Sequence, residues 1–559
     1  MEKLSYKAFM NDVRQRLAYC SEEELRHLIM EWAAAELPDK RLDFLNKLKP
    51  DSQEAMPETD ADALMDDIEV FARNVEDGAY VDGYGWDDNY MEERDFGDES
   101  WAWEMDDFFV EARHLLKESH HEAAEKAYRK LFAVLEMGEE PGHLPGDVFI
   151  ENMLEIDLQE HVALFLRSVY INAKSGERVN LLYEAMKEFS YLTSPNVKLT
   201  DINDSLDASL PDFHDFLTGW IEFLKEKPIP HVNALLREAV FLKGGIPAIA
   251  EFARGYANKF PEAYMDWIAA LEKEGDRESI LQVVTEGLDN IPGTFTVRAN
   301  IAEKMTEIGN VRRDNRMALK GLRESFHSNP SMNYLLDLYM LAEEENCLDD
   351  VRDEAEKRMN DLRNAGSATR GFTDRRHAAI DEGDYIHALI LGGRYETVFE
   401  MCQGKGALGW SFSDHPKPVM LTFLMDVLSK GDDYSHVRND QWRYAISRMS
   451  FGTPDIDMAK YHHIINRVKD NVRLTDEQEE FYLTWCQNET GRRIDAIVSN
   501  KYRGSYDKAA KVLVAMAETL ADRGSEQDGH AFVETHRSKY SRYSAFRREI
   551  AKALQNSGL

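Results

Sequence analysis

Two groups of residues in this sequence carry the atoms that metal binding needs. Asp87, Asn89 and Glu92 have oxygen ligands of the kind that Ca²⁺ prefers. The spacing of a helix–loop–helix calcium site is absent, however, and no glycine stands at the required turn. The adjacent pairs His120–His121 and His462–His463 point to different faces of any helix, whereas a helical metal pair needs positions i and i+4. We therefore predict no metal site.

The residues for covalent catalysis are equally sparse. Cys402 and the pair Asp414–His415 can be drawn as a nucleophile and its base, but Cys402 falls on an apolar helical stripe, where cysteine is commonly a buried structural thiol. The sequence has no phosphate-binding glycine loop before a helix, no His-Glu-x-x-His and no Gly-x-Ser-x-Gly. The prediction is a protein without catalytic residues and without cofactors, and a hydrolase is the least supported alternative.

An acidic segment rich in aromatic residues is the strongest local bias. Residues 51–115 contain 22 Asp and Glu against three Arg and no Lys. Helices are expected on both sides of its centre, over about 61–74 and 101–118. One interpretation is an acidic loop whose rings pack back on the first helices. The other is a docking surface for a basic partner, because exposed rings beside charge favour binding. The candidate partner-binding residues are Tyr80, Tyr84, Trp86, Tyr90, Phe96 and Trp101.

The composition of the whole chain excludes several classes of function. The net charge of −36 over 559 residues argues against nucleic acid as the general partner, because phosphate is repelled. The apolar share of 43% supports a substantial core, and no uninterrupted apolar run is long enough to span a membrane. The four scattered cysteines and the absence of a signal peptide at the N-terminus indicate a cytoplasmic protein with reduced thiols.

Repeated helical hairpins must position whatever surface this protein uses. Residues 260–330 predict helix, turn, helix and stop, twice over, with breaks at Gly275–Asp276 and Gly309–Asn310. The closing prolines of successive units are 31 and 38 residues apart, close to the period of roughly 34 that marks stacked helical hairpins. A single hairpin cannot bury its apolar face alone, so the units stack and present an extended surface. The fold class is therefore predicted as all-α, an α-solenoid of helical-hairpin repeats in two lobes.

The predicted domains follow changes in pattern along the chain. They are an N-terminal helical bundle at 1–50, the acidic segment at 51–100, a helical-repeat lobe at 101–365, a linker and loop region with one hairpin at 366–418, and a C-terminal helical lobe at 419–559. Residues 366–371 are small and polar, as a linker is. An exposed hinge is expected within 404–418, with the candidate residues Gly404, Gly406, Asp414, Pro416 and Pro418.

The end of the C-terminal lobe reverses the sign of the charge. Residues 491–559 hold 13 Lys and Arg against eight Asp and Glu, among the rings of Tyr502, Tyr540, Tyr543 and Phe546. Basic and aromatic residues together can hold single-stranded nucleic acid. The interpretation we favour is a terminal helical repeat with a solvated face, because the excess is small and the field of the whole chain opposes RNA and DNA.

The hairpin pattern resembles the tetratricopeptide repeat. With Gly275 as the turn glycine, the positions where that repeat packs are filled by Trp267, Leu271, Ile280, Val284 and Pro292. A broader resemblance is carried by the acidic, Tyr- and Trp-rich segment before the first hairpin, by Leu391-Gly392-Gly393-Arg394-Tyr395, by Leu408-Gly409-Trp410-Ser411 with Asp414-His415-Pro416, and by residues 492–498 with 503–510. These stretches look like the helical region of bacterial SWIM-zinc-finger-associated proteins. That resemblance implies an all-helical protein, and the zinc motif Cys-x-Cys then Cys-x-His is missing here.

The size, the two predicted lobes and a hinge near 404–418 or 430–439 are also similar to an accessory protein of type III-E CRISPR systems. That resemblance implies a bacterial antiviral protein that a caspase-like protease cleaves and that restrains a sigma factor. The function that we predict first is a non-catalytic scaffold or adaptor that binds another protein, and the cleaved regulator is the alternative.

Overall fold

The computed structural model describes residues 59–87, 92–146, 149–193, 196–227, 230–364, 378–407, 415–429, 435–447 and 456–559. The predicted bundle at 1–50 and the linker at 366–371 lie outside these residues. Contacts between Cα atoms divide the chain into two compact units, 1–213 and 214–559. The described residues are almost all helical, with one two-stranded sheet. The predicted all-α fold of helical repeats is confirmed, while the domain limits stay a prediction.

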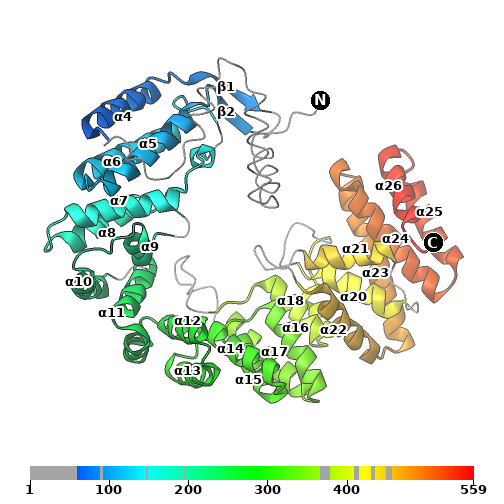
Figure 1. Ribbon diagram of the computed structural model, residues 1–559. Coiled ribbons are helices and arrows are strands. Elements are labelled where there is room, and N and C mark those ends of the chain that lie inside the picture. The colour runs from blue at the N-terminus through cyan, green and yellow to red at the C-terminus, as the bar shows by residue number, and fades with distance from the viewer. Residues whose placement is uncertain are drawn as a thin grey trace, which may run out of the picture. The chain divides into compact units, whose positions relative to one another are not determined.

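The first unit consists of helices and one short hairpin of strands, which connects α4 to α5 (Figure 1). Its elements are α4 (Ala61–Glu76), β1 (Val81–Asp87), β2 (Glu92–Gly97), α5 (Trp101–Lys117), α6 (His121–Gly138), η1 (Ile150–Met153), α7 (Leu158–Asn172), α8 (Arg178–Glu188) and α9 (Leu199–Asp204). The helices expected over 61–74 and 101–118 correspond to α4 and α5. The strands between them were not predicted.

Rings hold the core of the first unit together. Phe109, Phe132 and Phe165 come from α5, α6 and α7, and neighbouring centroids lie 5.6 Å apart. Tyr128 and His161 join this cluster, with the Tyr128 hydroxyl 3.2 Å from His161 Nδ1. Such a cluster places the large apolar area of each ring where water is excluded, and the hydroxyl finds a partner. It fixes α5, the helix that carries the end of the acidic segment.

The second unit contains the predicted hairpins and the C-terminal helices. Its elements are α10 (Phe213–Lys225), α11 (Pro230–Tyr256), α12 (Ala263–Glu274), α13 (Arg277–Asn290), α14 (Val297–Arg312), α15 (Asn315–Ser328), α16 (Met332–Glu344), α17 (Leu348–Asn364), α18 (Glu382–Leu391), α19 (Tyr395–Met401), α20 (Lys417–Leu428), α21 (His436–Ile446), α22 (Met458–Asn471), α23 (Asp476–Val498), η3 (Arg503–Ser505), α24 (Tyr506–Arg523), α25 (Glu526–Lys539) and α26 (Ser544–Gln555). None of the described helices combines the length and the apolar character that crossing a bilayer requires.

The turn between α12 and α13 shows how the hairpins are made. Gly275 ends α12 with φ +76°, a left-handed conformation that glycine adopts without steric cost. Asp276 then caps α13, and its side chain accepts a hydrogen bond of 3.1 Å from the backbone N–H of Ser279. Trp267, Ile280 and Val284 are buried, as the repeat pattern requires. The predicted break at Gly275–Asp276 is confirmed.

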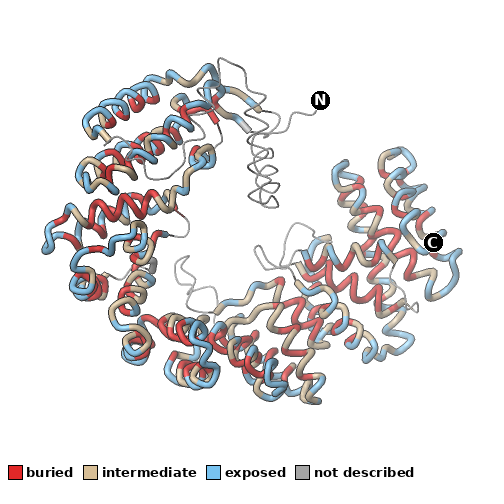
Figure 2. The backbone as a smooth tube through the Cα atoms, viewed as in Figure 1, coloured by how far each residue is buried: buried red, intermediate tan, exposed pale blue. Residues whose placement is uncertain are grey.

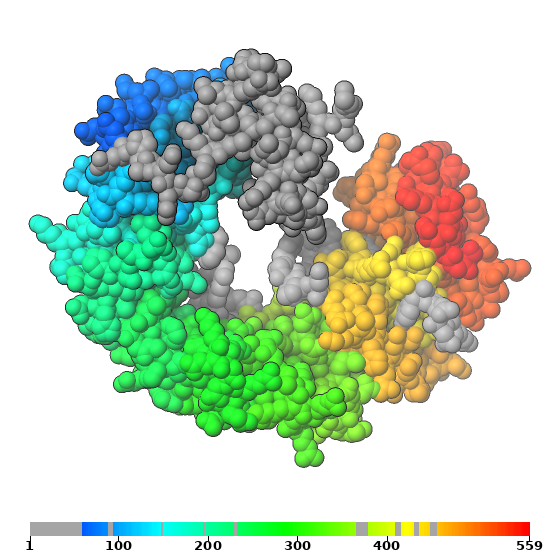
Figure 3. Space-filling view, viewed as in Figure 1, coloured from blue at the N-terminus to red at the C-terminus, as the bar shows by residue number. Residues whose placement is uncertain are grey.

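The predicted break at Gly309–Asn310 is wrong. Helix α14 continues through both residues, and the turn comes at Arg313, whose φ is +57°. Gly309 serves close packing instead, because a Cβ there would lie 2.6 Å from the backbone nitrogen of Ala318 in α15. Gly321 on α15 does the same, since its Cβ would lie 2.8 Å from the Ala302 carbonyl oxygen of α14. The two helices touch backbone to backbone, and α12 to α17, in green, form a continuous surface (Figure 3).

One apolar core runs from α15 to α26 and includes the short hairpin α18–α19. Residues of α20 are buried along almost the whole helix, and residues 512–519 of α24 are all buried (Figure 2). A helix that is apolar on every side has to lie inside a larger helical assembly. The hairpin predicted within 366–418 thus packs into the core of the second unit.

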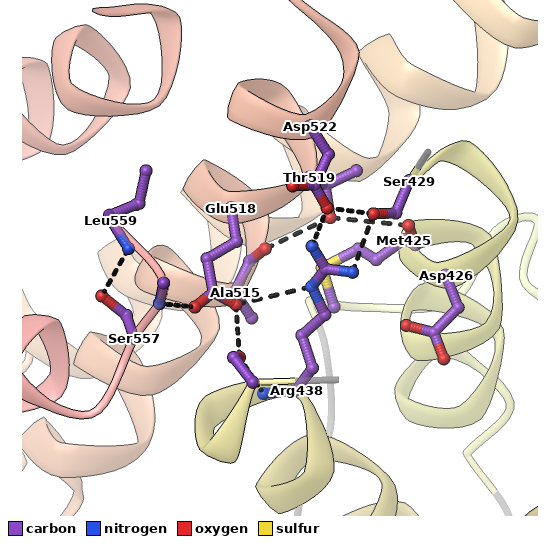
Figure 4. A network of polar contacts seen from close by, with 12 residues as sticks. Met425, Asp426, Ser429, Arg438, Ala515, Glu518, Thr519, Asp522, Ser557 and Leu559 are labelled. Atoms are coloured by element: carbon purple, nitrogen blue, oxygen red, sulfur yellow. Dashed lines mark hydrogen bonds and ion pairs between the residues drawn. The ribbon is translucent and has the colours of Figure 1, made fainter. Parts of the chain in front are cut away.

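Buried ions tie the C-terminal helices to one another. Lys417 Nζ lies 2.9 Å from Glu489 Oε1, and both side chains are almost completely buried. In a second network, Arg438 of α21 contacts Asp522 and lies 3.4 Å from Glu518 Oε2, both on α24 (Figure 4). Glu518 also accepts a hydrogen bond of 2.8 Å from the backbone N–H of Gly558. Charges in such surroundings are tolerated because each is paired and hydrogen-bonded.

Candidate functional site

The acidic segment folds as an antiparallel hairpin of β1 and β2. Tyr84 pairs with Asp95 and Trp86 with Glu93, and a register shift lies between Val81 and Gly83. Residues that pair directly share a face of the sheet, so Tyr84 and Trp86 lie on one face. Phe96 pairs with Gly83 and lies on the other face. The alternation of Tyr84, Gly85 and Trp86 was the signal in the sequence for a strand with exposed rings.

Three of the predicted partner-binding rings are exposed on this hairpin. The exposed fraction is 57% for Tyr84 and for Trp86, and 40% for Phe96. Tyr80 is half-buried at the start of the hairpin and packs edge-on against Phe71 of α4. Tyr90 lies outside the described residues. A cluster of exposed large apolar side chains indicates a binding site, whereas a single exposed one is common on protein surfaces.

Trp101 does not belong to this surface, and its prediction as a partner-binding residue is wrong. Its side chain is fully buried, and its indole N–H donates a hydrogen bond of 2.8 Å to the carbonyl oxygen of Pro145. Trp103, two residues later in the first turn of α5, is 62% exposed. Residues two positions apart on a helix point in directions that differ by about 200°. When one of the two indoles faces the core, the other therefore faces solvent. The sequence pattern did not identify which one.

Carboxylates surround the exposed rings. The Tyr84 hydroxyl donates to Glu93 Oε2 over 3.2 Å, and the Tyr80 hydroxyl donates to Glu104 Oε2 over 2.8 Å. Burial and the neighbouring Glu104 carboxylate raise the pKa of Tyr80, so it stays a neutral donor. We call the exposed rings of Tyr84 and Trp86, together with the carboxylate of Glu93 on the same face, the hairpin surface, and the exposed ring of Phe96 lies on the opposite face.

The single cation of the hairpin forms ion pairs with carboxylates of the same segment. Arg94 is the one Lys or Arg between residues 78 and 104. It lies 3.1 Å from Glu99 and 3.8 Å from Asp87. Asp95 is turned inward and accepts a hydrogen bond of 2.6 Å from the backbone N–H of Gly142, which fixes β2 on the helices. The remaining acids leave a strongly negative surface around apolar rings.

The residues predicted as an exposed hinge fall into two groups. Gly404 and Gly406 are exposed, and Gly404 has φ +71°. Asp414 lies outside the described residues. Pro416 and Pro418 are buried at the start of α20, so the expectation of exposure is wrong for them. Proline fits the first turn of a helix, whose N–H groups have no intrahelical partner, and this first turn lies in the core.

The catalytic arrangement considered for Cys402 finds no support in the structure. The thiol is buried directly after the end of α19, and burial raises its pKa to about 12, which opposes formation of the nucleophilic thiolate. His463 lies 3.3 Å from Glu343, and the histidines at 120 and 121 stand at the start of α6. Within the described ranges, no group of three or more His, Cys, Asp or Glu side chains is arranged to hold a metal ion.

Comparison with known proteins finds similar solved structures but no family. No family model and no curated protein matches the chain. One similar solved structure is a circular tandem repeat protein with a novel repeat topology, at 13% identity and a TM-score of 0.15, covering 96% of this chain and 94% of that chain. Another is a monomeric mutant of IFIT1 with m7Gppp-AAAA, at 11% identity and a TM-score of 0.16, covering 85% and 95%.

Proposed function

We propose that this helical-repeat protein is a non-catalytic scaffold that binds another protein, and that the hairpin surface docks a basic segment of that partner. The observation that carries the proposal is the pair of exposed rings, Tyr84 and Trp86, on one face of an acidic hairpin whose single arginine is already paired. Rings supply apolar contact area and attract cations to their faces, and carboxylates select for Lys and Arg.

Stacked hairpins suit this role because each repeat adds surface without needing a pocket. In the second unit the repeats are fastened by polar contacts between neighbours. Arg254 makes a two-pronged contact with Glu286, and Arg298 pairs with Glu324 at 2.6 Å. A rigid stack holds its exposed side chains in fixed positions, which lowers the entropic cost of binding.

The test separates specific docking from attraction to net charge. A fluorescein-labelled peptide of alternating lysine and alanine serves as the probe in fluorescence anisotropy. The double variant Tyr84→Ser/Trp86→Ser should lose about tenfold or more in affinity, because buried aromatic contacts dominate such interfaces. The control is Val311→Ser, which alters a side chain that is 65% exposed on α14.

Both variants keep the same net charge as the parent chain, so a peptide held by the overall acidic field would bind them equally. Equal affinity for the two variants would therefore contradict docking at the hairpin surface. The affinity of the parent chain should also fall as salt rises from 0.1 to 0.5 M, since the Debye length shrinks from about 10 Å to a few ångströms.

A further inference from the structure

The C-terminal helices carry an excess of Lys and Arg in a chain that is otherwise strongly acidic. Residues 491–559 have 13 Lys and Arg against eight Asp and Glu, within a chain of net charge −36. At least five of these 13 cations form ion pairs, among them Arg523 with Glu479, Lys511 with Asp440 and Lys539 with Asp495, each at 2.7 Å. Pairing is the ordinary outcome where carboxylates are abundant.

Six exposed cations depart from this rule: Arg548 and Lys552 further along α26, and four others near the start of α24 and of α26. Lys501, Arg503, Arg542 and Arg547 make no side-chain hydrogen bond or ion pair within the part of the chain that the structure describes. A further exposed ring, Tyr502, stands among them with 61% of its surface accessible. We call these four cations and Tyr502 the basic end.

The topology of the last three helices brings these residues to one end of the lobe. Helix α24 begins after Lys501 and Arg503, α25 runs back, and the connection to α26 contains Arg542. A ring cluster spans the same end, with centroids 5.8 Å apart for Tyr506 and Phe546 and 5.7 Å apart for Tyr540 and Phe546. The N-termini of α24 and α26 both point to this end, and their dipoles add positive potential.

We infer that the basic end binds a carboxylate-rich segment of a partner protein. Arginine presents a planar fork of donors that fits a carboxylate in two-pronged fashion, and lysine adds a mobile charge. Exposed cations without partners of their own keep their donors available to such a ligand. The surface is therefore opposite in sign to the hairpin surface, and it lies on the other unit of the chain.

The same residues disfavour single-stranded nucleic acid as the occupant. Tyr540 is 4% exposed and Phe546 is fully buried, so two of the rings beside the arginines serve the core. Stacking of successive bases needs several exposed rings, and Tyr502 alone offers one. A polyanion as dense as a nucleic acid is also repelled by the remainder of this acidic chain, whereas a short acidic segment falls within one Debye length, about 8 Å at physiological salt.

The test uses the full chain and a fluorescein-labelled octaglutamate peptide in fluorescence anisotropy. The triple variant Arg503→Gln/Arg542→Gln/Arg547→Gln should bind the peptide about tenfold or more weakly, because each arginine lost removes one charge-assisted contact. The matched control, Arg277→Gln/Arg316→Gln/Lys320→Gln, removes three exposed charges from α13 and α15 of the same unit. Its affinity should stay within about twofold of the parent chain, since it leaves the basic end intact.

Three outcomes would overturn the inference. Equal losses in the two triple variants would show that net charge alone attracts the peptide. Tighter binding of a labelled dT12 oligonucleotide, with the same sensitivity to the basic-end variant, would assign the surface to nucleic acid. Self-association of the parent chain in sedimentation velocity without peptide, abolished by that variant, would make a second copy the occupant. Thermal unfolding of each variant within a few degrees of the parent confirms that the fold is kept.

Discussion

Trp101 and Trp103 show what single residues add to a pattern. Both lie in the acidic segment and both carry an indole, yet one fills the core and the other faces water. The deciding contact is the hydrogen bond from Trp101 to the carbonyl of Pro145, 44 residues away along the chain. Composition and spacing contain no trace of that partner. Exposure of Tyr84 and Trp86, in contrast, follows from alternation within a short strand.

The buried histidine of the first unit makes its stability depend on pH. His161 is 3% exposed, and burial lowers its pKa to about 4. In the unfolded chain its pKa is about 6.5, so between these values the unfolded state binds more protons. Stability that is fully present above pH 6.5 is lost as pH falls toward 4. From pH 7.5 to 5.5 this group should cost the first unit roughly 1 kcal/mol.

Hydrogen exchange of amides in α6 and α7 at pH 7.5 and 5.5, corrected for intrinsic rates, measures this loss in the first unit alone. His161→Gln should remove most of the pH dependence, even if the variant is less stable overall. The exposed His120→Gln serves as the control and should leave the slope unchanged. A His161→Gln chain with an undiminished slope would place the titration elsewhere.

At the scale of elements, glycine divides correct predictions from incorrect ones. Gly275 ends a helix because its left-handed φ is needed, and the sequence predicts that turn. Gly309 is followed by Asn310 much as Gly275 is followed by Asp276, but it lies inside α14. There its missing side chain allows α15 to pack closely against α14. A missing side chain permits either a turn or a close contact, and one sequence does not separate the two. The helices, their turns and their apolar faces were otherwise predictable, because a periodicity of 3.6 is a local property.

The close contact between α14 and α15 is testable with one methyl group. In Gly321→Ala the new Cβ would meet the backbone of Ala302 and Thr306 at 2.8 Å, so the helices must shift. We expect a loss of about 1–3 kcal/mol in the free energy of unfolding, as for other overpacked sites. Urea unfolding followed by circular dichroism gives the value.

The matched control is Gly255→Ala in α11, where a Cβ meets nothing within 4 Å. Alanine favours the helix there, so that variant should be neutral or more stable by up to about 1 kcal/mol. If the two variants lose the same stability, packing of α14 on α15 is not the reason for the glycine.

At the scale of the whole molecule, the chain should be cut first between its packed parts. We expect the earliest cleavage in limited proteolysis near 51–60, 366–372 or 404–418. Of these, 51–58, 366–372 and 408–414 lie outside the described residues, while Gly404 and Gly406 are exposed. A protease needs several residues of accessible, extended backbone, which hydrogen-bonded helices withhold. Mass spectrometry of the first fragments checks this.

Clean initial cuts inside 260–330 would contradict the stacked hairpins α12 to α15. Early cleavage at 404–418 would agree with the resemblance to the accessory protein of type III-E CRISPR systems. That this chain is a cleaved regulator stays a prediction.

The ion network around Arg438 sets an order of events during synthesis. Polar contacts among α12 to α15 join residues 22 to 34 positions apart, so these hairpins can form soon after they leave the ribosome. Arg438 reaches Asp522 across 84 positions, and Lys417 reaches Glu489 across 72. Closing such long loops is slow, and an ion buried without its partner is strongly destabilising. The stack can therefore grow step by step as it is translated, whereas α20 and α21 must wait for α23 and α24 before their charges are neutralised.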